Sequence, residues 1–338
     1  MPSIVMTGGG TGGHLAIVKA VKEELRDQRL IYVGSSGGQD RRWFENDEDF
    51  AERYFLESRG VVNQGPVGKI RSLARLTREI VRARRILRRE EAGAVFSVGG
   101  YSAAPAAIAA VLSGIPLVIH EQNAVSGSLN RLLRPFAKAF ISSYDSDSPI
   151  HAYPVKSVFF EKARVRREVK RILFLGGSQG AVAINKLALA LAPELQRRGI
   201  AITHQAGERN LDEVRQAYEE LGIEAEVFGF SDRIPEWMAE ADFAVARAGA
   251  STLWELAANG LPTLFVPYPY AAGDHQYHNA RFLAEKGLAW VIREEALRPE
   301  EVPELFDEDL ERISRGLMEE VSPAGSAEIA ELLRSRLS

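Results

Sequence analysis

Two glycine-rich loops follow short apolar runs, and each has the composition of a backbone that binds phosphate. Residues 8–13 lie in "SIVMTGGGTGGHLAIV" and residues 176–180 in "RILFLGGSQGAVAI". Glycine lets backbone amides approach a ligand, and the following helix directs unpaired N–H groups and its positive dipole end towards an anion. Either loop alone is as well explained by a tight turn that packs its helix closely. Because two such loops occur, the sequence favours ligand binding.

A dinucleotide is the first ligand to test, because Gly8, Gly10 and Gly13 satisfy the spacing G-x-G-x-x-G. That interpretation needs an acidic residue at the end of the second strand to bind the ribose hydroxyls. The second strand, "RLIYVGSSGG", ends in glycine and serine instead. A nicotinamide-dependent oxidoreductase is therefore disfavoured.

His14 directly follows the first loop, and a second polar cluster, "HEQN" at residues 120–123, follows the apolar run "PLVI". The first turn of a helix favours a neutral imidazole, which can act as a general base. The alternative is a histidine that only donates a hydrogen bond to a nearby carbonyl. Glu121 is the second candidate base, and the alternative for its cluster is a loop that caps the next helix through Ser126 or Ser128.

The second half of the chain has polar residues suited to a sugar nucleotide. In "ARAGASTLWELAANG", Glu255 lies on a short helix that begins near Ser251 and Thr252, where a carboxylate can accept two ribose hydroxyls. Read alone, Glu255 is more often a solvated helix residue. Farther on, "GDHQYHNA" offers hydrogen-bonding groups for sugar hydroxyls at Asp274, His275, Gln276 and Asn279. His275 and His278 with Asp274 lack the further ligands of a zinc site, so no metal is expected.

Length and composition indicate the class of protein in which these sites lie. A chain of 338 residues with 46% hydrophobic and 26% charged residues is globular and suits two domains. It contains no cysteine, which excludes disulfides and thiolate metal sites and agrees with a cytosolic compartment. The first residues enter a strand directly, so no secretory signal is expected. The uncharged stretch 98–119 is interrupted by Pro105, Gly114 and Pro116, and we interpret it as loop, helix and strand.

Strand-like and helix-like segments alternate along nearly the whole chain. The runs "SIVMT", "RLIYVG", "AVFSVG", "PLVIHE" and "AFISSY" are followed in the second half by "RILFLG", "AITHQAG", "EAEVFGF", "FAVARA" and "PTLFVPY". This alternation predicts parallel sheets covered by helices. Each half opens as strand, glycine loop and amphipathic helix, the start of a Rossmann-like unit. We predict domains at 1–153 and 154–324, with a ligand cleft at the carboxyl ends of the strands.

The charge is unevenly distributed between the two halves. Residues 1–160 carry 21 lysines and arginines against 16 acidic residues, whereas the remainder carries 21 against 30. In "KIRSLARLTREIVRARRILRRE", apolar residues repeat at helical spacing at Leu73, Leu76, Ile80, Ala83 and Leu87. The segment is thus a basic amphipathic helix, which either binds an anionic membrane surface or packs on the core with a solvated basic face.

Taken together, these segments resemble the MurG family of bacterial glycosyltransferases over nearly the whole chain. The resemblance rests on "TGGGTGGH", "SVGGYSAAPA", "HEQNAVSG", "FLGGSQGA", "RAGASTLWELAANGLPTLFVP" and "DHQYHNA", in this order. It implies an α/β chain with the GT-B fold, two doubly wound Rossmann-like domains flanking an interdomain cleft. It also implies that the last helix, within 325–338, packs back on the first domain.

The resemblance implies transfer of N-acetylglucosamine from UDP-GlcNAc to the 4-hydroxyl of MurNAc in undecaprenyl-linked lipid I, with inversion, giving lipid II. His14 would be the base, with Glu121 as the alternative, and neither cofactor nor metal is implied. Binding roles are carried over to matching positions in both halves: Thr11, Gly12, Gly13, Asn123, Lys156, Ser178, Phe230, Ser231, Ser251, Thr252, Glu255, His275 and Gln276.

Two positions depart from the family pattern. Ile17 stands where the family usually has proline, and Lys156 stands where it usually has an arginine that contacts the donor. A lysine cannot reproduce the planar contact of a guanidinium, so donor affinity is expected to differ.

The implied partners are the donor, the acceptor, an anionic membrane surface and cell-wall synthesis proteins, at the cytoplasmic face of the bacterial membrane, with no nucleic acid. The alternative functions are a related GT-B enzyme acting on diacylglycerol and a non-catalytic UDP-sugar-binding protein.

Overall fold

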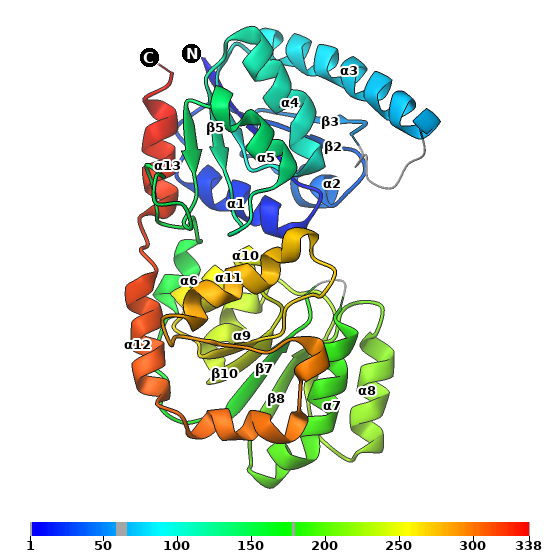
Figure 1. The fold of residues 1–338 in the computed structure, drawn as a ribbon, viewed down its shortest axis with the longest axis vertical. Helices are drawn as coiled ribbons and strands as arrows, with labels where there is room; N and C mark the ends of the chain where they lie inside the picture. Colours follow the sequence, from blue (N-terminus) through cyan, green and yellow to red (C-terminus); the bar gives the residue numbers. More distant parts are fainter. Residues whose placement is uncertain (1, 59–65, 178–179, 338) are drawn as a thin grey trace. The chain divides into compact units, whose positions relative to one another are not determined.

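The structure, a computed structural model, describes residues 2–58, 66–177 and 180–337, of which 66–70 are described by their backbone alone (Figure 1). The chain divides into two compact units. Unit 1 comprises Met1–Val155 and Ala324–Ser338, and unit 2 comprises Lys156–Pro323. Each unit has its own parallel sheet.

The sheet of unit 1 has six strands in the order β3-β2-β1-β4-β5-β6. Its central strands are continuous apolar runs, as expected where helices cover both faces of a sheet. Every residue of β1 and β2 is buried. The strands are β1 (Ser3–Thr7), β2 (Leu30–Ser35), β3 (Glu52–Leu56), β4 (Ala92–Ser97), β5 (Leu117–His120) and β6 (Ala139–Ile141).

Helices connect the strands of unit 1, and a further helix at the C-terminus of the chain also belongs to this unit. They are α1 (Gly12–Glu23), α2 (Asp40–Phe44), α3 (Pro66–Arg89), α4 (Gly100–Ser113), α5 (Ser128–Leu133) and α13 (Gly325–Arg334), with the 3-10 helix η1 (Arg134–Phe136). The C-terminal helix α13 packs against α1, and Arg334 donates 2.6 Å hydrogen bonds to the Glu24 carbonyl and the Asp27 carboxylate. A side chain on Gly325 would come within 2.6 Å of the carbonyl oxygens of Ala152 and Tyr153. Glycine thus permits the close approach with which α13 begins.

Helices α3 and α4 pack together, and both correspond to segments singled out in the sequence. The stretch 98–119 contains α4 and β5, which confirms its interpretation as loop, helix and strand. Pro105, however, lies inside α4 and does not interrupt it, contrary to expectation. Its fixed φ suits a helix, although it lacks the N–H group that would bond to the carbonyl four residues earlier. None of the described helices is both long and apolar enough to cross a membrane.

Unit 2 repeats the topology of unit 1, with its strands in the order β12-β11-β10-β7-β8-β9. Counted from its own first strand, the order is the same as in unit 1, so the sequence repeat correctly predicted two Rossmann-like units. The strands are β7 (Arg171–Leu175), β8 (Ala201–Gln205), β9 (Glu226–Phe228), β10 (Phe243–Ala246), β11 (Thr263–Phe265) and β12 (Trp290–Val291).

The helices of unit 2 cover this sheet. They are α6 (Ser157–Glu161), α7 (Val182–Arg197), α8 (Leu211–Glu220), α9 (Ile234–Glu240), α10 (Ala250–Ala258), α11 (His275–Ala284) and α12 (Leu310–Glu320), with 3-10 helices η2 (Ala272–Asp274), η3 (Glu294–Ala296) and η4 (Pro299–Asp307). All ten predicted strand segments contain a strand, but β3 and β12 were not predicted. β3 begins with an exposed glutamate and an arginine at the sheet edge, and β12 pairs over only two residues of the apolar segment 288–292.

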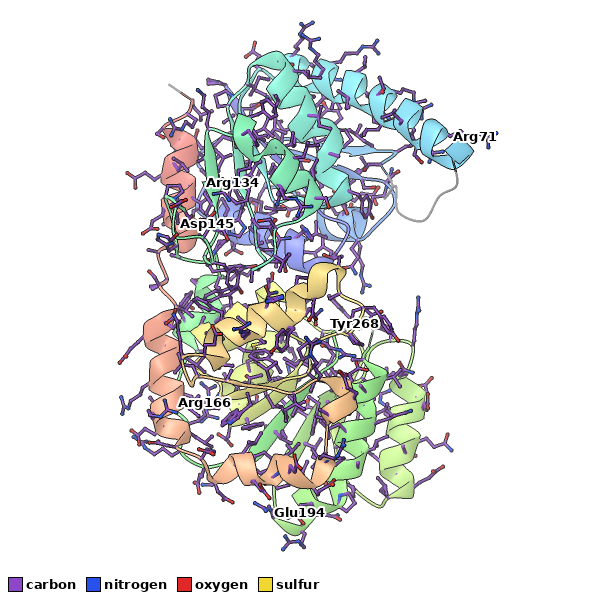
Figure 2. The ribbon with its side chains drawn as sticks, viewed as in Figure 1. Arg71, Arg134, Asp145, Arg166, Glu194 and Tyr268 are labelled. Atoms are coloured by element: carbon purple, nitrogen blue, oxygen red, sulfur yellow. The ribbon has the colours of Figure 1, made fainter. Side chains whose placement is uncertain are left out.

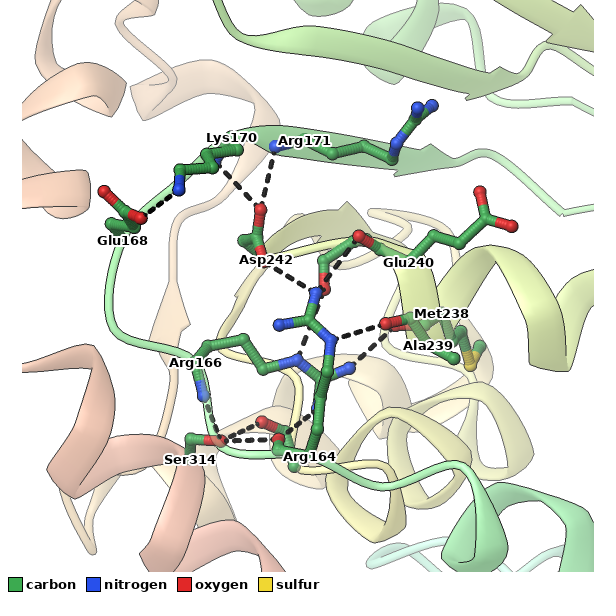
Figure 3. A network of polar contacts seen from close by, with 12 residues as sticks. Arg164, Arg166, Glu168, Lys170, Arg171, Met238, Ala239, Glu240, Asp242 and Ser314 are labelled. Carbon is green, nitrogen blue, oxygen red and sulfur yellow. Dashed lines mark hydrogen bonds and ion pairs between the residues drawn. The ribbon is translucent and has the colours of Figure 1, made fainter.

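A buried guanidinium ties the helix ends of unit 2 together (Figure 3). Arg166 is fully buried and donates to the carbonyl oxygens of Met238 at 2.8 Å and Ala241 at 3.2 Å, where α9 ends. It also donates to the carbonyl and side-chain oxygens of Asn259, which caps the end of α10. Burial lowers the pKa of Arg166 to about 9, so the group is still charged at neutral pH. Arg166 therefore joins the negative ends of two helix dipoles.

Candidate active site

In unit 1, the candidate residues lie at the carboxyl edge of the sheet. The first glycine loop follows β1, and the "HEQN" cluster follows β5. Gly8 and Gly10 adopt φ of +125° and +85°, which glycine alone adopts without strain. Helix α1 then begins at Gly12, and its N-cap residue Thr11 makes no side-chain capping bond. The first turn of α1 thus presents backbone donors that its own N-cap side chain does not cover.

A buried carboxylate, that of Asp40, binds the first glycine loop. Asp40, fully buried at the start of α2, accepts hydrogen bonds from the Gly10 amide at 2.8 Å and the Ser35 amide at 2.9 Å. It also accepts from the hydroxyls of Tyr32 at 3.0 Å and Ser102 at 2.8 Å. The loop after β1, the end of β2 and helix α4 are thereby tied to one group. Sequence reasoning missed Asp40, and the only signal for it was its position beside Gly34, Gly37 and Gly38.

His14 lies in the first turn of α1 and contacts both the loop and the "HEQN" cluster. Its Nδ1 is 2.8 Å from the Thr11 hydroxyl, and its Nε2 is 2.6 Å from the side-chain amide nitrogen of Gln122. The structure thus brings together two segments 108 residues apart. Gln122 is buried, and sequence reasoning did not select it although it lies inside the quoted cluster.

The rest of the "HEQN" cluster is held inside unit 1. The Glu121 carboxylate is buried and accepts from the amides of Asn123 at 3.0 Å and Gly127 at 2.8 Å and from the Asn130 side chain at 2.9 Å. Both of its oxygens are therefore engaged by the following loop. His120 is fully buried, and burial, helped by the nearby His14, lowers its pKa to about 3. His120 is therefore neutral at physiological pH.

In unit 2, the second glycine loop follows β7, and helix α7 follows the loop. Gly177 and Gly180 have φ of +78° and +79°. The Gly177 amide donates to the Gln205 side chain at 3.1 Å, which fixes the loop to the end of β8. Ser178, a predicted donor ligand, lies outside the described residues.

Helix α10 follows β10, the neighbour of β7, so its first turn lies at the same sheet edge. Ser251 is buried and Thr252 is partly buried in that turn. One turn later, burial raises the pKa of Glu255 to about 8, while the positive charge of Lys156 acts in the opposite direction. The structure thus places Lys156 near Glu255, although these two candidate residues lie 99 positions apart.

The remaining candidates follow β9 and β11, again at the carboxyl edge of the sheet. The Phe230 amide donates to Glu208 at 2.8 Å, and the Ser231 hydroxyl accepts from the Arg233 amide at 3.0 Å. The side-chain oxygen of Gln276 accepts from the Tyr268 amide at 2.9 Å. Its NH₂ group is then the part of the amide left to bind a ligand.

His275 and Asp274 precede Gln276 in the chain. Burial lowers the pKa of His275, which keeps its imidazole neutral. Asp274 adopts a left-handed φ of +54° and forms an ion pair with Arg293, and this ion pair lowers the pKa of Asp274. Among the described residues, no group of three or more histidines and carboxylates is arranged to hold a metal.

Comparisons with known proteins place both units in one family. Residues 4–142 match the glycosyltransferase family 28 N-terminal domain, and residues 171–335 match the glycosyltransferase family 28 C-terminal domain. Over 333 residues, 98% of each chain, the protein is 62% identical to the "UDP-N-acetylglucosamine--N-acetylmuramyl-(pentapeptide) pyrophosphoryl-undecaprenol N-acetylglucosamine transferase" of Sulfurovum sp. (strain NBC37-1). It is 55% identical to the protein of the same name from Wolinella succinogenes, over 98% of this chain and 100% of the relative.

A solved structure supports the same assignment. The crystal structure of Acinetobacter baumannii MurG is similar with a TM-score of 0.80 and 28% identity, covering 99% of this chain and 100% of that one. The chain therefore belongs to the MurG family, glycosyltransferases of family 28 whose two Rossmann-like domains form the GT-B fold.

Proposed function

We propose that this glycosyltransferase transfers N-acetylglucosamine from UDP-GlcNAc to the 4-hydroxyl of MurNAc in lipid I, forming lipid II with inversion at the anomeric carbon. The observation that carries the proposal is the 62% identity, over 98% of both chains, to a relative whose name states this donor and acceptor. The reaction is a single displacement in which the acceptor oxygen attacks as UDP leaves. His14 takes the hydroxyl proton.

We assign the donor to unit 2. The second glycine loop with Ser178, and Ser251 and Thr252 in the first turn of α10, bind the diphosphate, where helix N-termini stabilise the leaving group. Glu255 binds the ribose with Lys156 beside it. The remaining contacts are assigned to Phe230 and Ser231 for uracil and to His275 and Gln276 for the sugar.

The acceptor is assigned to unit 1. Thr11, Gly12 and Gly13 bind its diphosphate at the start of α1, where Thr11 leaves the helix uncapped. Asn123, whose backbone and side-chain amides both donate to Glu121, is the exception in this unit, because we assign it to the donor side. This division gives domains of 1–153 and 154–324, with the last helix belonging to the first domain.

The acceptor assignment is tested by incubating the enzyme with radiolabelled UDP-GlcNAc and either lipid I or diacylglycerol in detergent. Labelled lipid II is expected, and diacylglycerol is expected to stay unlabelled. Labelling of diacylglycerol alone would show a related enzyme with another acceptor. Tight UDP-GlcNAc binding without transfer to either lipid would show a sugar-nucleotide-binding protein.

The Glu255→Gln and Gln276→Ala variants are expected to separate nucleotide from sugar recognition. Glu255→Gln should weaken UDP and UDP-GlcNAc equally, by about tenfold, because the lost hydrogen bonds are to the shared ribose. Gln276→Ala should weaken UDP-GlcNAc and spare UDP. Calorimetric titration of both ligands measures this. Unchanged UDP affinity in Glu255→Gln would show that the ribose binds elsewhere.

The elevated pKa of Glu255 also predicts a pH dependence of donor binding. With a pKa of about 8 in the free protein, the carboxyl group is largely protonated at pH 6.5 and must lose its proton to accept two hydroxyls. UDP affinity should therefore rise by about tenfold between pH 6.5 and pH 8.5. Glu255→Gln is the control, because it has no carboxyl group to titrate at this position. Any change of UDP affinity with pH that remains in this variant comes from other groups, such as the phosphates of UDP.

We further propose that unit 1 binds an anionic membrane surface at the cytoplasmic face through the exposed part of α3. Ala83, Ile86 and Leu87 are buried in the core of unit 1, so the second half of the helix packs inward. Leu73 is 64% exposed and Val81 is 46% exposed among arginines. Figure 2 shows Arg71 pointing away from unit 1 at the start of this helix. An apolar and basic surface of this kind suits a lipid headgroup layer.

A charge-reversal variant tests the membrane surface. Changing Arg71, Arg75, Arg85 and Arg88 to glutamate should abolish most sedimentation with vesicles that contain anionic lipid, and salt should weaken wild-type binding. The matched control reverses four exposed arginines of unit 2, Arg167, Arg197, Arg209 and Arg315, and changes the net charge equally. If both variants lose vesicle binding equally, the membrane-binding surface does not lie specifically on α3.

A further inference from the structure

The two ring edges of His14 face different surroundings. The Nδ1 edge lies 2.8 Å from the hydroxyl of Thr11, a residue that is exposed. The Nε2 edge lies 2.6 Å from the buried Gln122 side chain. A Cβ on Gly100 would come within 3.4 Å of Nε2, so the backbone at the start of α4 also lines this edge. Nε2 is therefore the inward nitrogen and Nδ1 the outward one.

The hydrogen bond to Gln122 decides which nitrogen has a lone pair. An amide can present its oxygen or its nitrogen by rotating 180° about its last bond. If the amide nitrogen donates to Nε2, the ring proton is on Nδ1, and no nitrogen can accept a proton from a ligand. If the amide oxygen accepts from Nε2–H, the lone pair is on Nδ1, beside Thr11. Within the described residues, the Gln122 side-chain oxygen has no hydrogen-bond partner while the amide nitrogen lies against Nε2.

We propose that Gln122 is a positioning residue that accepts a hydrogen bond from His14 Nε2–H and so makes Nδ1 the basic nitrogen. This inference rests on the proposed function, in which His14 is the base. The acceptor hydroxyl takes the place of the Thr11 hydroxyl at Nδ1. Its oxygen then bonds to the anomeric carbon, the bond from that carbon to UDP breaks, and the proton moves to Nδ1. The resulting imidazolium donates from Nε2 to Gln122.

Three ionisable residues near this pair, His120, Glu121 and Asp40, are buried. His120 is buried and neutral, since burial lowers its pKa to about 3. The Glu121 carboxylate accepts hydrogen bonds from Asn123, Gly127 and Asn130. Asp40 accepts from Gly10 on the other side of the loop. A neutral amide behind Nε2 orients the ring without stabilising its protonated form, as a carboxylate would.

Three variants test the role of Gln122 in activity. Gln122→Met keeps the volume but removes the acceptor, and it should lower kcat at least about tenfold while the KM for UDP-GlcNAc stays unchanged. Gln122→Glu keeps an acceptor and should retain more activity. The acidic limb of its kcat–pH profile should move to higher pH, because the carboxylate stabilises the imidazolium. Gln28→Met, at a partly exposed glutamine of the same unit whose amide contacts only Asp27 among the hydrogen bonds described, is the control and should behave as wild type.

The tautomer itself can be measured without substrate. In protein labelled with ¹⁵N-histidine, long-range ¹H–¹⁵N spectra should show His14 protonated at Nε2, and His14→Gln assigns the signal among the six histidines. Gln122→Met should produce a mixture of tautomers. A proton on Nδ1 in the wild type, or wild-type kcat in Gln122→Met, would overturn the role of Gln122. Retained turnover in His14→Gln would instead overturn the proposed base, so the two failures are distinguishable.

Discussion

His14→Gln is expected to lower turnover with lipid I at least about a hundredfold while leaving the affinity for UDP-GlcNAc unchanged. Glutamine retains hydrogen-bonding groups but cannot take a proton at neutral pH. The contacts of His14 are with Thr11 and Gln122 in unit 1, whereas the proposed donor residues belong to unit 2. Loss of the imidazole should therefore affect the chemical step and spare donor binding.

The measurement is single-turnover transfer of radiolabelled GlcNAc, with calorimetric titration of UDP-GlcNAc in parallel. His151→Gln is the matched control, because His151 is an exposed histidine of the same unit. If His14→Gln keeps most of its turnover, the base must be another group, and Glu121→Gln becomes the next variant to test. Glu121 accepts three hydrogen bonds from its own loop and one from Asn130 in α5, which favours a role in holding the loop against that helix.

The repeated unit of strand, glycine loop and helix could be predicted because its signal is local. An apolar run followed by glycines and a 3.6-residue period identifies β1 and β7 without knowledge of any partner. The alternation of segments then fixes parallel sheets, and parallel strands bring their carboxyl ends to one edge. His14 and the "HEQN" cluster could thus be assigned to one edge of unit 1 before any distance was known.

Contacts between distant segments could not be predicted in the same way. Nothing in "HEQN" indicates that Gln122 and not Glu121 reaches His14, because that depends on which side chain the end of β5 turns towards α1. Asp40 lies in a polar segment, yet it is buried where Gly9, Gly34 and Gly38 leave room for its carboxylate, in the loop after β1, at the end of β2 and just before α2.

The segment "KARVRREVK" shows the same limit within two adjacent residues. Its charge pattern predicts a solvated surface, and Arg167 is indeed exposed, paired with Glu311. Arg166, its neighbour, is fully buried. The chain alternates sides in this extended segment, and apart from the Arg164 carbonyl the backbone carbonyls that Arg166 binds come from residues more than 70 positions away. The local charge pattern therefore cannot indicate that Arg166 will be buried among those carbonyls.

Arg166→Met is expected to reduce the unfolding free energy of unit 2 by about 3–5 kcal/mol. Methionine fills most of the volume but leaves the carbonyls of Met238, Ala241 and Asn259 buried without a donor. Arg166→Lys should also be destabilising, because an ammonium group cannot reach acceptors spread around a planar guanidinium. Urea unfolding followed by tryptophan fluorescence measures this, since three of the four tryptophans, Trp237, Trp254 and Trp290, belong to unit 2.

Arg167→Met is the control for this change, because it replaces the neighbouring arginine with the same residue. Arg167 is exposed and pairs with Glu311, so its loss should alter stability little. The effect of Arg166 should extend to the donor site, since Asn259 caps the helix whose first turns carry Thr252 and Glu255. Saturating UDP should therefore recover part of the lost stability in Arg166→Met, because a ligand that binds only the folded unit shifts the equilibrium towards it. Equal unfolding midpoints for Arg166→Met and Arg167→Met would show that the buried network contributes no more than the surface ion pair.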